Sequence, residues 1–407
     1  MRATAALVAA SALAAGASAE NYLGFNSGAT LPDRSAKFKS DFEAEFRTAQ
    51  NLKNAPGTFN SVRLYTNIQA YSTDDPIEAF EAAIETKTKL LLGIWASGTD
   101  SIDKELSALK KAIDKYGDDF TDLVIGMSIG SEDLYRDSET GIKNKAGIGA
   151  GPNVLLGFID DYKKAVAKTP LAGIPIGHVD TWDAWTNSTN KAVVDALDWI
   201  GVDEYPYYEG GKGNDIKNSG QLFDRAFDAV KAAVGDKPIW VTETGWPTTG
   251  PDWDQAVPSV ENAKYYWDEI GCRKLFNKVP TFWYNLRDSN PDNDMKFAIT
   301  KDLSTTPYFD LTCPTKFQTP ENSGPSGSPT GSPTGSPTGV TPPSSNPTGS
   351  TGTETGTETG SDDESGSGSE GATSPEPTDS GASAIAKSLS AAAVAGLAVI
   401  GGIFALF

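Results

Sequence analysis

The chain has 407 residues, with 54 acidic and 34 basic side chains and a formal net charge of −20 at pH 7. This acidic balance argues against nucleic acid or an anionic membrane surface as a partner, because there is no basic excess to displace counterions. One His and two Cys argue against a metal site built from imidazole and thiolate ligands. We therefore expect no metal and no cofactor, and we expect carboxylates to be the acid and base groups.

The composition also limits the number of folded domains. A prior of about 150 residues per domain would allow two or three. Residues 321–407, however, hold nine acids and one base, a net of 1 − 9 = −8, and contain no Trp, Tyr or Cys. They cannot form an aromatic-rich core. The remaining roughly 300 residues are enough for one large domain, which we place at residues 20–318.

Residues 1–19 are typical of a secretory signal peptide. A charged start at Arg2 is followed by a short apolar run and an Ala-Ser-Ala cleavage site that ends at Ala19. The alternative, a membrane-spanning helix, needs a longer apolar run. Because export leads to an oxidising compartment, we expect Cys272 and Cys313 to be joined to each other.

Short apolar runs recur through residues 20–318, with helical stretches between them. Most are continuously apolar, as expected of parallel strands covered on both faces. Their starts lie about 25 to 50 residues apart, which leaves room for a crossover helix each time. The eight runs are Tyr22–Asn26, Ser61–Tyr65, Lys89–Trp95, Leu123–Ile129, Ile174–Val179, Trp199–Asp203, Pro238–Thr242 and Thr281–Asn285.

The stretches between these runs carry helix signals. Asp75, Pro76 and Glu78 combine an N-cap, a proline at the first helical position and an acid at the third, and residues 101–116 keep a helical period up to Gly117. Eight strand–helix units predict a (β/α)₈ barrel, the TIM barrel of the α/β class, with an open doubly wound sheet as the main alternative.

The segment at 319–380 has the composition of an extended stalk. Gly-Ser-Pro-Thr occurs three times in a row from Gly327, and Gly-Thr-Glu-Thr occurs twice from Gly352. Such sequence buries too little apolar surface to offset its ordering entropy, so we expect a disordered, O-glycosylated stalk. In the folded domain, Asn187 begins the sequence Asn-Ser-Thr and is the expected N-glycosylation site.

Residues 389–407 are apolar, without a charge, and small residues precede them across a short spacer. This pattern is typical of a glycosylphosphatidylinositol attachment signal, with Ser380 or Gly381 as the modified residue and residues 381–407 as the removed propeptide. A spanning helix would usually have Lys or Arg beyond it. We expect a secreted monomer, held at the cell membrane and cell wall by this lipid anchor.

Two glutamates follow apolar strands directly. Glu132 comes after the fourth run, which ends in small residues, and Glu243 comes after the seventh, just before Gly245-Trp246-Pro247. In a closed barrel the carboxyl ends of all strands open at one mouth, so both carboxylates would lie there. The alternative is that each is a solvated loop acid.

Paired carboxylates at one mouth suit glycoside hydrolysis. A separation of about 5 to 5.5 Å gives retention of configuration, whereas about 6.5 to 9.5 Å leaves room for water and gives inversion. The charge of one carboxylate raises the pKa of the other, which divides them into an acid and an anion. The residues themselves leave open which is which.

Residues 20–315 resemble the fungal endo-β-1,3-glucanases of glycoside hydrolase family seventeen. The most specific match is Trp240-Val-Thr-Glu-Thr-Gly-Trp-Pro-Thr-Thr, and Val62–Tyr65, Ile129–Glu132 and Val202–Tyr207 support it. The resemblance implies a (β/α)₈ barrel that cleaves internal β-1,3-glucosidic bonds with retention. It also implies that Glu132 is the acid/base and Glu243 the nucleophile. The signal, stalk and anchor resemble those of the cell-wall-attached members.

The resemblance implies a β-1,3-glucan substrate, which is neutral, so binding should depend on hydroxyl hydrogen bonds and on aromatic faces. Tyr65, Tyr205, Trp246 and Trp283 are the expected substrate contacts, because they lie at or just beyond predicted strand ends. The alternative for each is a place in the barrel core. Ser131 stands where many relatives have Asn, so we expect the sugar contact of that Asn to be shortened, mediated by water or absent.

Other functions compete with this interpretation. Gly126-Met-Ser-Ile-Gly130 matches the nucleophile elbow of serine hydrolases, but the only imidazole, His178, follows too closely, and we expect a hydrogen-bonded strand-end residue there. A β-1,3-glucanosyltransferase would use the same residues and resolve the glycosyl-enzyme with a second glucan chain. A non-catalytic wall adhesin would keep the aromatic residues but has no need of both carboxylates.

Overall fold

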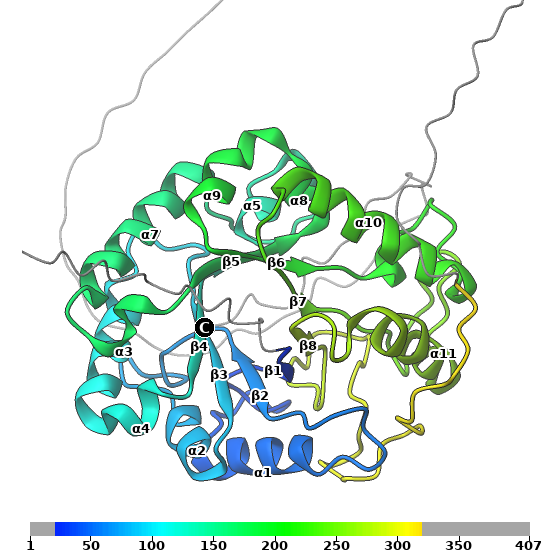
Figure 1. The fold of residues 1–407 in the computed structure, drawn as a ribbon, viewed down its shortest axis with the longest axis horizontal. Coiled ribbons are helices and arrows are strands. Elements are labelled where there is room, and N and C mark those ends of the chain that lie inside the picture. The colour runs from blue at the N-terminus through cyan, green and yellow to red at the C-terminus, as the bar shows by residue number, and fades with distance from the viewer. Residues whose placement is uncertain (1–20, 320–407) are drawn as a thin grey trace, which may run out of the picture. The chain divides into compact units, whose positions relative to one another are not determined.

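The computed structural model describes residues 21–319, which form a closed barrel of eight parallel strands. The strands follow one another around the barrel in chain order, and helices surround them (Figure 1). The predicted (β/α)₈ fold is confirmed, and the open doubly wound sheet is wrong. The strands are β1 Leu23–Ser27, β2 Ser61–Leu64, β3 Lys89–Ile94, β4 Val124–Ser131, β5 Ile176–Thr181, β6 Trp199–Asp203, β7 Ile239–Glu243 and β8 Thr281–Trp283.

Pairing between the first and last strands closes the barrel. Leu23 of β1 lies opposite Thr281 of β8, and Phe25 lies opposite Trp283. Each of the eight apolar runs overlaps one strand, because each has enough branched and aromatic residues to be buried on both faces. The predicted strand ends differ from those of the structure by a few residues; for example, β4 continues to Ser131, and β5 begins at Ile176.

The helices between the strands form the outer layer. They are α1 Lys39–Gln50, α2 Ala79–Thr86, α3 Asp103–Tyr116, α4 Asp118–Thr121, α5 Asp133–Arg136, α6 Glu139–Lys143, α7 Pro152–Val166, α8 Trp182–Thr186, α9 Lys191–Ala196, α10 Ser219–Val234 and α11 Val260–Tyr266. Short 3₁₀ turns η1 Pro170–Gly173, η2 Ser188–Asn190, η3 Pro206–Tyr208 and η4 Ile216–Asn218 and the π-helical segment η5 Trp267–Leu275 complete them.

One helix start differs from the sequence prediction. Helix α2 begins at Ala79, whereas the signals at Asp75 and Pro76 predict a start at Pro76. Pro76 instead pairs with Ile68 in an isolated antiparallel bridge, so this segment is extended. By contrast, α3 ends as expected at Gly117, whose φ of 56° suits a residue without a side chain.

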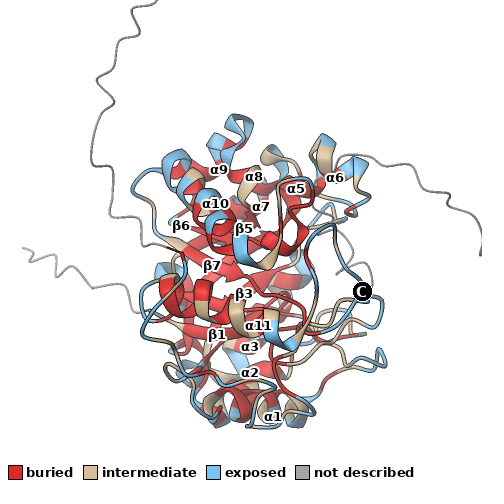
Figure 2. Cartoon of the chain, turned by 90° about the vertical axis from the view of Figure 1, so that its right-hand side faces the viewer, coloured by how far each residue is buried: buried red, intermediate tan, exposed pale blue. Residues whose placement is uncertain are grey.

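The core has an inner and an outer part. Figure 2 shows the strands almost entirely buried and the outer faces of the helices exposed. Inside the barrel, the strands contribute a separate cluster, mostly from their amino-terminal halves, of Leu91, Ile125, Val179, Trp199, Trp240 and Phe282. The rings of Trp199 and Trp240 stack with centroids 4.5 Å apart. Because these large side chains fill the amino-terminal half of the barrel, polar side chains inside it lie toward the carboxyl-terminal mouth.

A disulfide bond joins Cys272 of η5 to Cys313, 41 residues later, and so ties the segment after β8 to the helical layer. No helix within residues 21–319 has the length and apolarity needed to cross a bilayer. The signal segment 1–19, the stalk from residue 320 onward and the anchor residues Ser380 and Gly381 lie outside the described residues, and these three assignments stay predictions.

Candidate active site

Both predicted glutamates lie at the carboxyl ends of barrel strands, and both are buried. Glu243 is the last residue of β7 and is 2% exposed, while Glu132 follows β4 and is 3% exposed. Their charges interact, because the carboxylate of Glu243 contributes to a raised pKa at Glu132. The guanidinium of Arg63 connects Glu243 to the residue before Glu132, because it donates from Nη1 to Oε1 of Glu243 at 2.5 Å and from Nη2 to Oγ of Ser131 at 2.9 Å.

Three donors converge on the carboxylate of Glu243. In addition to Arg63, the hydroxyl of Tyr65 donates to Oε1 at 2.8 Å, and the hydroxyl of Tyr205 donates to Oε2 at 2.8 Å. All three are buried together with Glu243. Hydrogen bonds from a cation and two hydroxyls stabilise the ionised carboxylate, which is the form that can act as a nucleophile.

Strand alternation explains how Arg63 reaches the inside of the barrel. Val62 and Leu64 on β2 pack outward against the helices, so Arg63 points inward. It is 1% exposed and donates to Oδ1 of Asn26 on β1 at 3.0 Å. The Nδ2 of Asn26 in turn donates to the carbonyls of Thr242 and Phe282, each at 3.0 Å. Arg63 is therefore held from both sides.

A further acid lies in this interior. Asp203, the last residue of β6, is fully buried and lies opposite Glu243 in the register of the two strands. Its Oδ1 accepts from Thr242 Oγ1 at 2.7 Å, and its Oδ2 has no hydrogen-bond partner among residues 21–319. Burial, together with the negative charge of Glu243, holds the pKa of Asp203 well above its usual range. The register of β6 and β7 thus places a second buried carboxyl group beside the one that pairs with Arg63.

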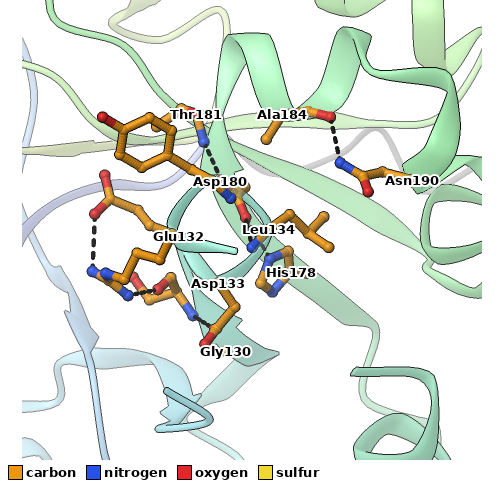
Figure 3. Close-up of polar contacts among 12 residues, drawn as sticks. Gly130, Glu132, Asp133, Leu134, His178, Asp180, Thr181, Ala184 and Asn190 are labelled. Atoms are coloured by element: carbon orange, nitrogen blue, oxygen red, sulfur yellow. Dashed lines mark hydrogen bonds and ion pairs between the residues drawn. The ribbon is translucent and has the colours of Figure 1, made fainter. Parts of the chain in front are cut away.

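Glu132 has a different environment from Glu243. Its Oε2 accepts from Nη2 of Arg136 at 3.0 Å, whereas its Oε1 is buried and has no partner among the described residues (Figure 3). Burial is the largest cause of a pKa raised to about 8, since it outweighs the opposing charge of Arg136, and the charge of Glu243 adds to the rise. Glu132 is therefore mainly protonated at pH 7, with one oxygen unoccupied by protein.

Strand β5 fixes the turn that carries Glu132. The backbone of Glu132 has a left-handed φ of 56°, and its N–H donates to the carbonyl of Val179 at 2.7 Å. Asp180 accepts from the N–H groups of Leu134 and Tyr135, at 2.8 and 3.2 Å (Figure 3). These bonds join β5 to Glu132 itself and to helix α5 directly after it, so the direction of Glu132 depends on a neighbouring strand.

His178 supports the same turn and has no exposed surface. One ring nitrogen lies 2.6 Å from the carbonyl oxygen of Ile129, and the other lies 2.9 Å from Oδ2 of Asp180. The expectation of a hydrogen-bonded residue is confirmed, but His178 lies within β5 and not at its end. The serine-hydrolase alternative has no support in this geometry, because Ser128 Oγ donates to the carbonyl of Gly130 and not to an imidazole.

The four aromatic residues expected to bind substrate divide into two pairs. Tyr65 and Tyr205 lie at Glu243, as described, with their hydroxyls rather than open ring faces directed into the site. Trp246 and Trp283 are each 2% exposed. The prediction that these two tryptophans offer a face to a sugar is wrong, because both belong to the aromatic core.

The packing around the two tryptophans gives the reason. Phe282 of β8 points into the barrel, so Trp283 points outward, where its ring lies 5.0 Å from that of Trp267 in η5. Trp246 packs edge-on against Tyr207 at 5.3 Å, and its Nε1 donates to the carbonyl of Val257 at 3.0 Å. Position at a strand end does not distinguish an inward from an outward side chain.

Sequence reasoning missed the polar residues that hold the two carboxylates. Asn26, Arg63 and Asp203 lie within apolar strand runs, and Arg136 lies four residues after Glu132. Burying a charged or amide side chain inside an apolar run is costly unless the side chain is paired. These polar residues within apolar runs were therefore the sequence signal that could have indicated a buried polar site.

The remaining site predictions concern modification and metal binding. Asn187 is exposed between α8 and η2, and its Oδ1 accepts from the N–H of Thr189 at 3.1 Å. Glycosylation there stays a prediction. In the part of the chain that the structure describes, no group of three or more His, Cys, Asp or Glu side chains is arranged to hold a metal ion.

Comparison with known proteins gives close relatives. A probable glucan endo-1,3-beta-glucosidase, eglC, of Aspergillus niger is 50% identical over 310 residues, which are 76% of this chain and 67% of the relative. The eglC protein of Aspergillus oryzae, described in the same words, is 51% identical over 304 residues, or 74% and 65% of the two chains. The matched region thus spans about two thirds of the length of these curated relatives.

Solved structures share the fold at lower identity. A glycoside hydrolase family 17 beta-1,3-glucanosyltransferase from Rhizomucor miehei has a TM-score of 0.56 and 23% identity, with 70% of this chain and 98% of that chain covered. An endo-laminarinase from Formosa has a TM-score of 0.53 and 14% identity, with 69% and 83% covered. Residues 33–301 also match the family described as the BtgE/BtgC glycoside hydrolase domain. With that match over most of the barrel, and with relatives about 50% identical, the chain belongs to the BtgE/BtgC glycoside hydrolase domain family.

Proposed function

We propose that this protein is a glucan endo-1,3-β-glucosidase that hydrolyses internal β-1,3-glucosidic bonds of cell-wall glucan with retention of configuration. The names of its relatives support the substrate and the bond. The observation that carries the catalytic assignment is the unequal environment of two carboxyl groups in one buried site. Glu243 accepts from Arg63, Tyr65 and Tyr205, whereas Glu132 has one unpartnered oxygen and a raised pKa.

This inequality supports one division of the two roles. Glu243, held as an anion, attacks the anomeric carbon, while Glu132 gives its proton to the departing glycosidic oxygen. A covalent glycosyl-enzyme on Glu243 results. Its formation removes the negative charge that helps to raise the pKa of Glu132, so Glu132 can then act as a base toward the incoming water.

The proposed residues can be tested by reducing-sugar release from β-1,3-glucan. We expect Glu243→Gln to abolish activity, because the amide is the same size and is not a nucleophile. A matched control is Glu261→Gln, which changes an exposed glutamate on α11. The first product should carry the β configuration, which proton NMR records before the sugar equilibrates. Activity retained in Glu243→Gln, or a product of the α configuration, would overturn the proposal.

Hydrolysis and glucanosyl transfer share every residue of this site, and they differ in their products. Incubation with a single β-1,3-linked oligosaccharide and analysis of product size separates them. We expect chains shorter than the starting material at early times. Chains longer than the starting material as the main product would assign the protein to transfer.

A further inference from the structure

We propose that a cavity beside the catalytic carboxyls, at the carboxyl ends of β2 and β3, is a binding subsite for further glucosyl residues of the same glucan chain. The proposal rests on the function proposed above and extends it. The cavity has a volume of about 300 Å³. Among the residues that line it are Thr66, Gln69, Tyr71, Trp95, Lys104 and Glu105.

Tyr65 and Arg136 connect this cavity to the two proposed catalytic residues. Thr66 follows Tyr65, whose hydroxyl donates to Glu243. On the other side, the guanidinium of Arg136 lies over the ring of Trp95, 5.5 Å from its centroid, and the same guanidinium pairs with Glu132. A chain bound across the two carboxyls therefore has a wall of this cavity as its neighbour, and a polymer substrate continues beyond the bond that is cleaved.

Tyr71 gives the cavity an open aromatic face. It is 74% exposed, the largest exposure among the large hydrophobic side chains within residues 21–319. Its backbone has a φ of 66°, a conformation that bulky residues rarely adopt, and its hydroxyl donates to the carbonyl of Arg34. An exposed ring held in an unfavourable backbone conformation indicates a role other than stability. Aromatic rings beside a few polar groups are typical of sugar-binding clefts.

The polar groups of the cavity fit a neutral ligand. Glu105 is buried and already accepts from Thr66 Oγ1 and from the N–H of Asn67 at 2.7 Å, and burial raises its pKa to about 7. It also accepts from the N–H of Trp95 at 3.4 Å and so joins the ends of β2 and β3, and both of its oxygens are occupied by these contacts. Lys104 is the only cation among the lining residues. The other polar groups are hydroxyls and an amide, which match the hydroxyls of a glucan chain.

The test compares oligosaccharides of different length. We expect Tyr71→Ala to lower the ratio of kcat/KM between a β-1,3-linked hexamer and trimer by about three- to tenfold, the effect of losing one aromatic contact. Tyr71→Phe, which keeps the ring and loses the hydrogen bond to Arg34, should keep the wild-type ratio. Tyr308→Ala removes a ring that is 45% exposed and does not line the cavity, and should also keep the ratio.

The outcomes of this test distinguish failure of the proposed subsite from failure of the proposed function. A hexamer-to-trimer ratio in Tyr71→Ala equal to that of the wild type would overturn the subsite, and so would an equal fall in Tyr71→Phe or Tyr308→Ala. Failure of the proposed function is recognised separately, since the wild type would then release no sugar from β-1,3-glucan or Glu243→Gln would stay active. As a second measurement, calorimetry with hexamer on Glu243→Gln should give weaker binding when Tyr71→Ala is added.

Discussion

The pairing of Arg136 with Glu132 predicts the alkaline limit of activity. Burial raises the pKa of Glu132 to about 8, so the acid form is present below that pH and is lost as the pH rises through it. Arg136 opposes this rise, because its cation stabilises the ionised carboxylate through a contact of 3.0 Å between two buried groups. A hydrogen bond to a charged group contributes about 1.5 to 3 kcal/mol. Since about 1.4 kcal/mol corresponds to one pH unit, Arg136→Gln should move the alkaline limb upward by about one to two pH units.

The assay is the pH profile of kcat/KM on a soluble β-1,3-linked oligosaccharide, which reports the ionisation of the free enzyme. Arg136→Lys is the matched control, because it keeps the charge and should leave the limb close to that of the wild type. The absolute rate of Arg136→Gln should fall, since Arg136 also donates to the carbonyl of Ser131 and to Oγ of Ser97 at 2.9 Å and so orients the loop. An alkaline limb that stays in place, or moves to lower pH, would refute the reasoning.

Four further outcomes follow from the structure and the sequence. Glu132→Ala should lose about 10²- to 10⁴-fold in activity on glucan but should retain more of its activity on an activated aryl glycoside, because that leaving group needs little protonation. Equal losses on the two substrates would exclude the acid role of Glu132. Glu132→Gln should make the free energy of unfolding less dependent on pH between about 4.5 and 8. In that window the folded wild type holds a proton that the unfolded chain releases, so the stability of the wild type falls by up to about 1.4 kcal/mol per pH unit. Denaturant titrations at several pH values measure this slope, and equal slopes in the two proteins would contradict the reasoning. Replacing Cys272 and Cys313 by Ala should lower the free energy of unfolding by about 4 kcal/mol in the chain-entropy model for a loop of 41 residues, and a loss below about 1 kcal/mol would argue against a structural role. Treatment of intact cells with a phosphatidylinositol-specific phospholipase should release the protein into the medium if the tail signal is used, whereas retention would favour a spanning tail.

The fold could be read from the sequence because it depends on local composition. Eight buried runs, each followed by a stretch long enough for a helix, leave few arrangements other than a closed parallel barrel, and each run overlaps one strand. The start of α2 could not be read in this way. Pro76 and Glu78 carry good helix signals, but a bridge between Pro76 and Ile68 keeps the segment extended. That bridge joins positions eight residues apart, and helix-start signals report only on immediate neighbours.

The site was only partly accessible to the same reasoning. Glu132 and Glu243 were identified because each directly follows an apolar strand, and strand ends in a barrel share one mouth. Trp246 and Trp283 satisfied the same criterion and lie in the core. For Trp283, strand alternation points the ring outward. Whether a strand-end residue points inward depends on the register of its strand with both neighbours, and a single sequence does not contain that information.

Sequence alone thus determined the barrel, the two candidate carboxylates and the chemistry that paired carboxylates suit, since these follow from which residues are apolar and where each run ends. Tertiary structure decided the different environments of the two carboxylates, on which their proposed roles rest. Arg63, Tyr65 and Tyr205 come from two other strand ends and converge on Glu243, while Arg136 and burial act on Glu132. The physical reason is that the charge state of a buried acid depends on donors and charges within a few ångströms, and closure of the barrel brings those together from distant positions in the chain.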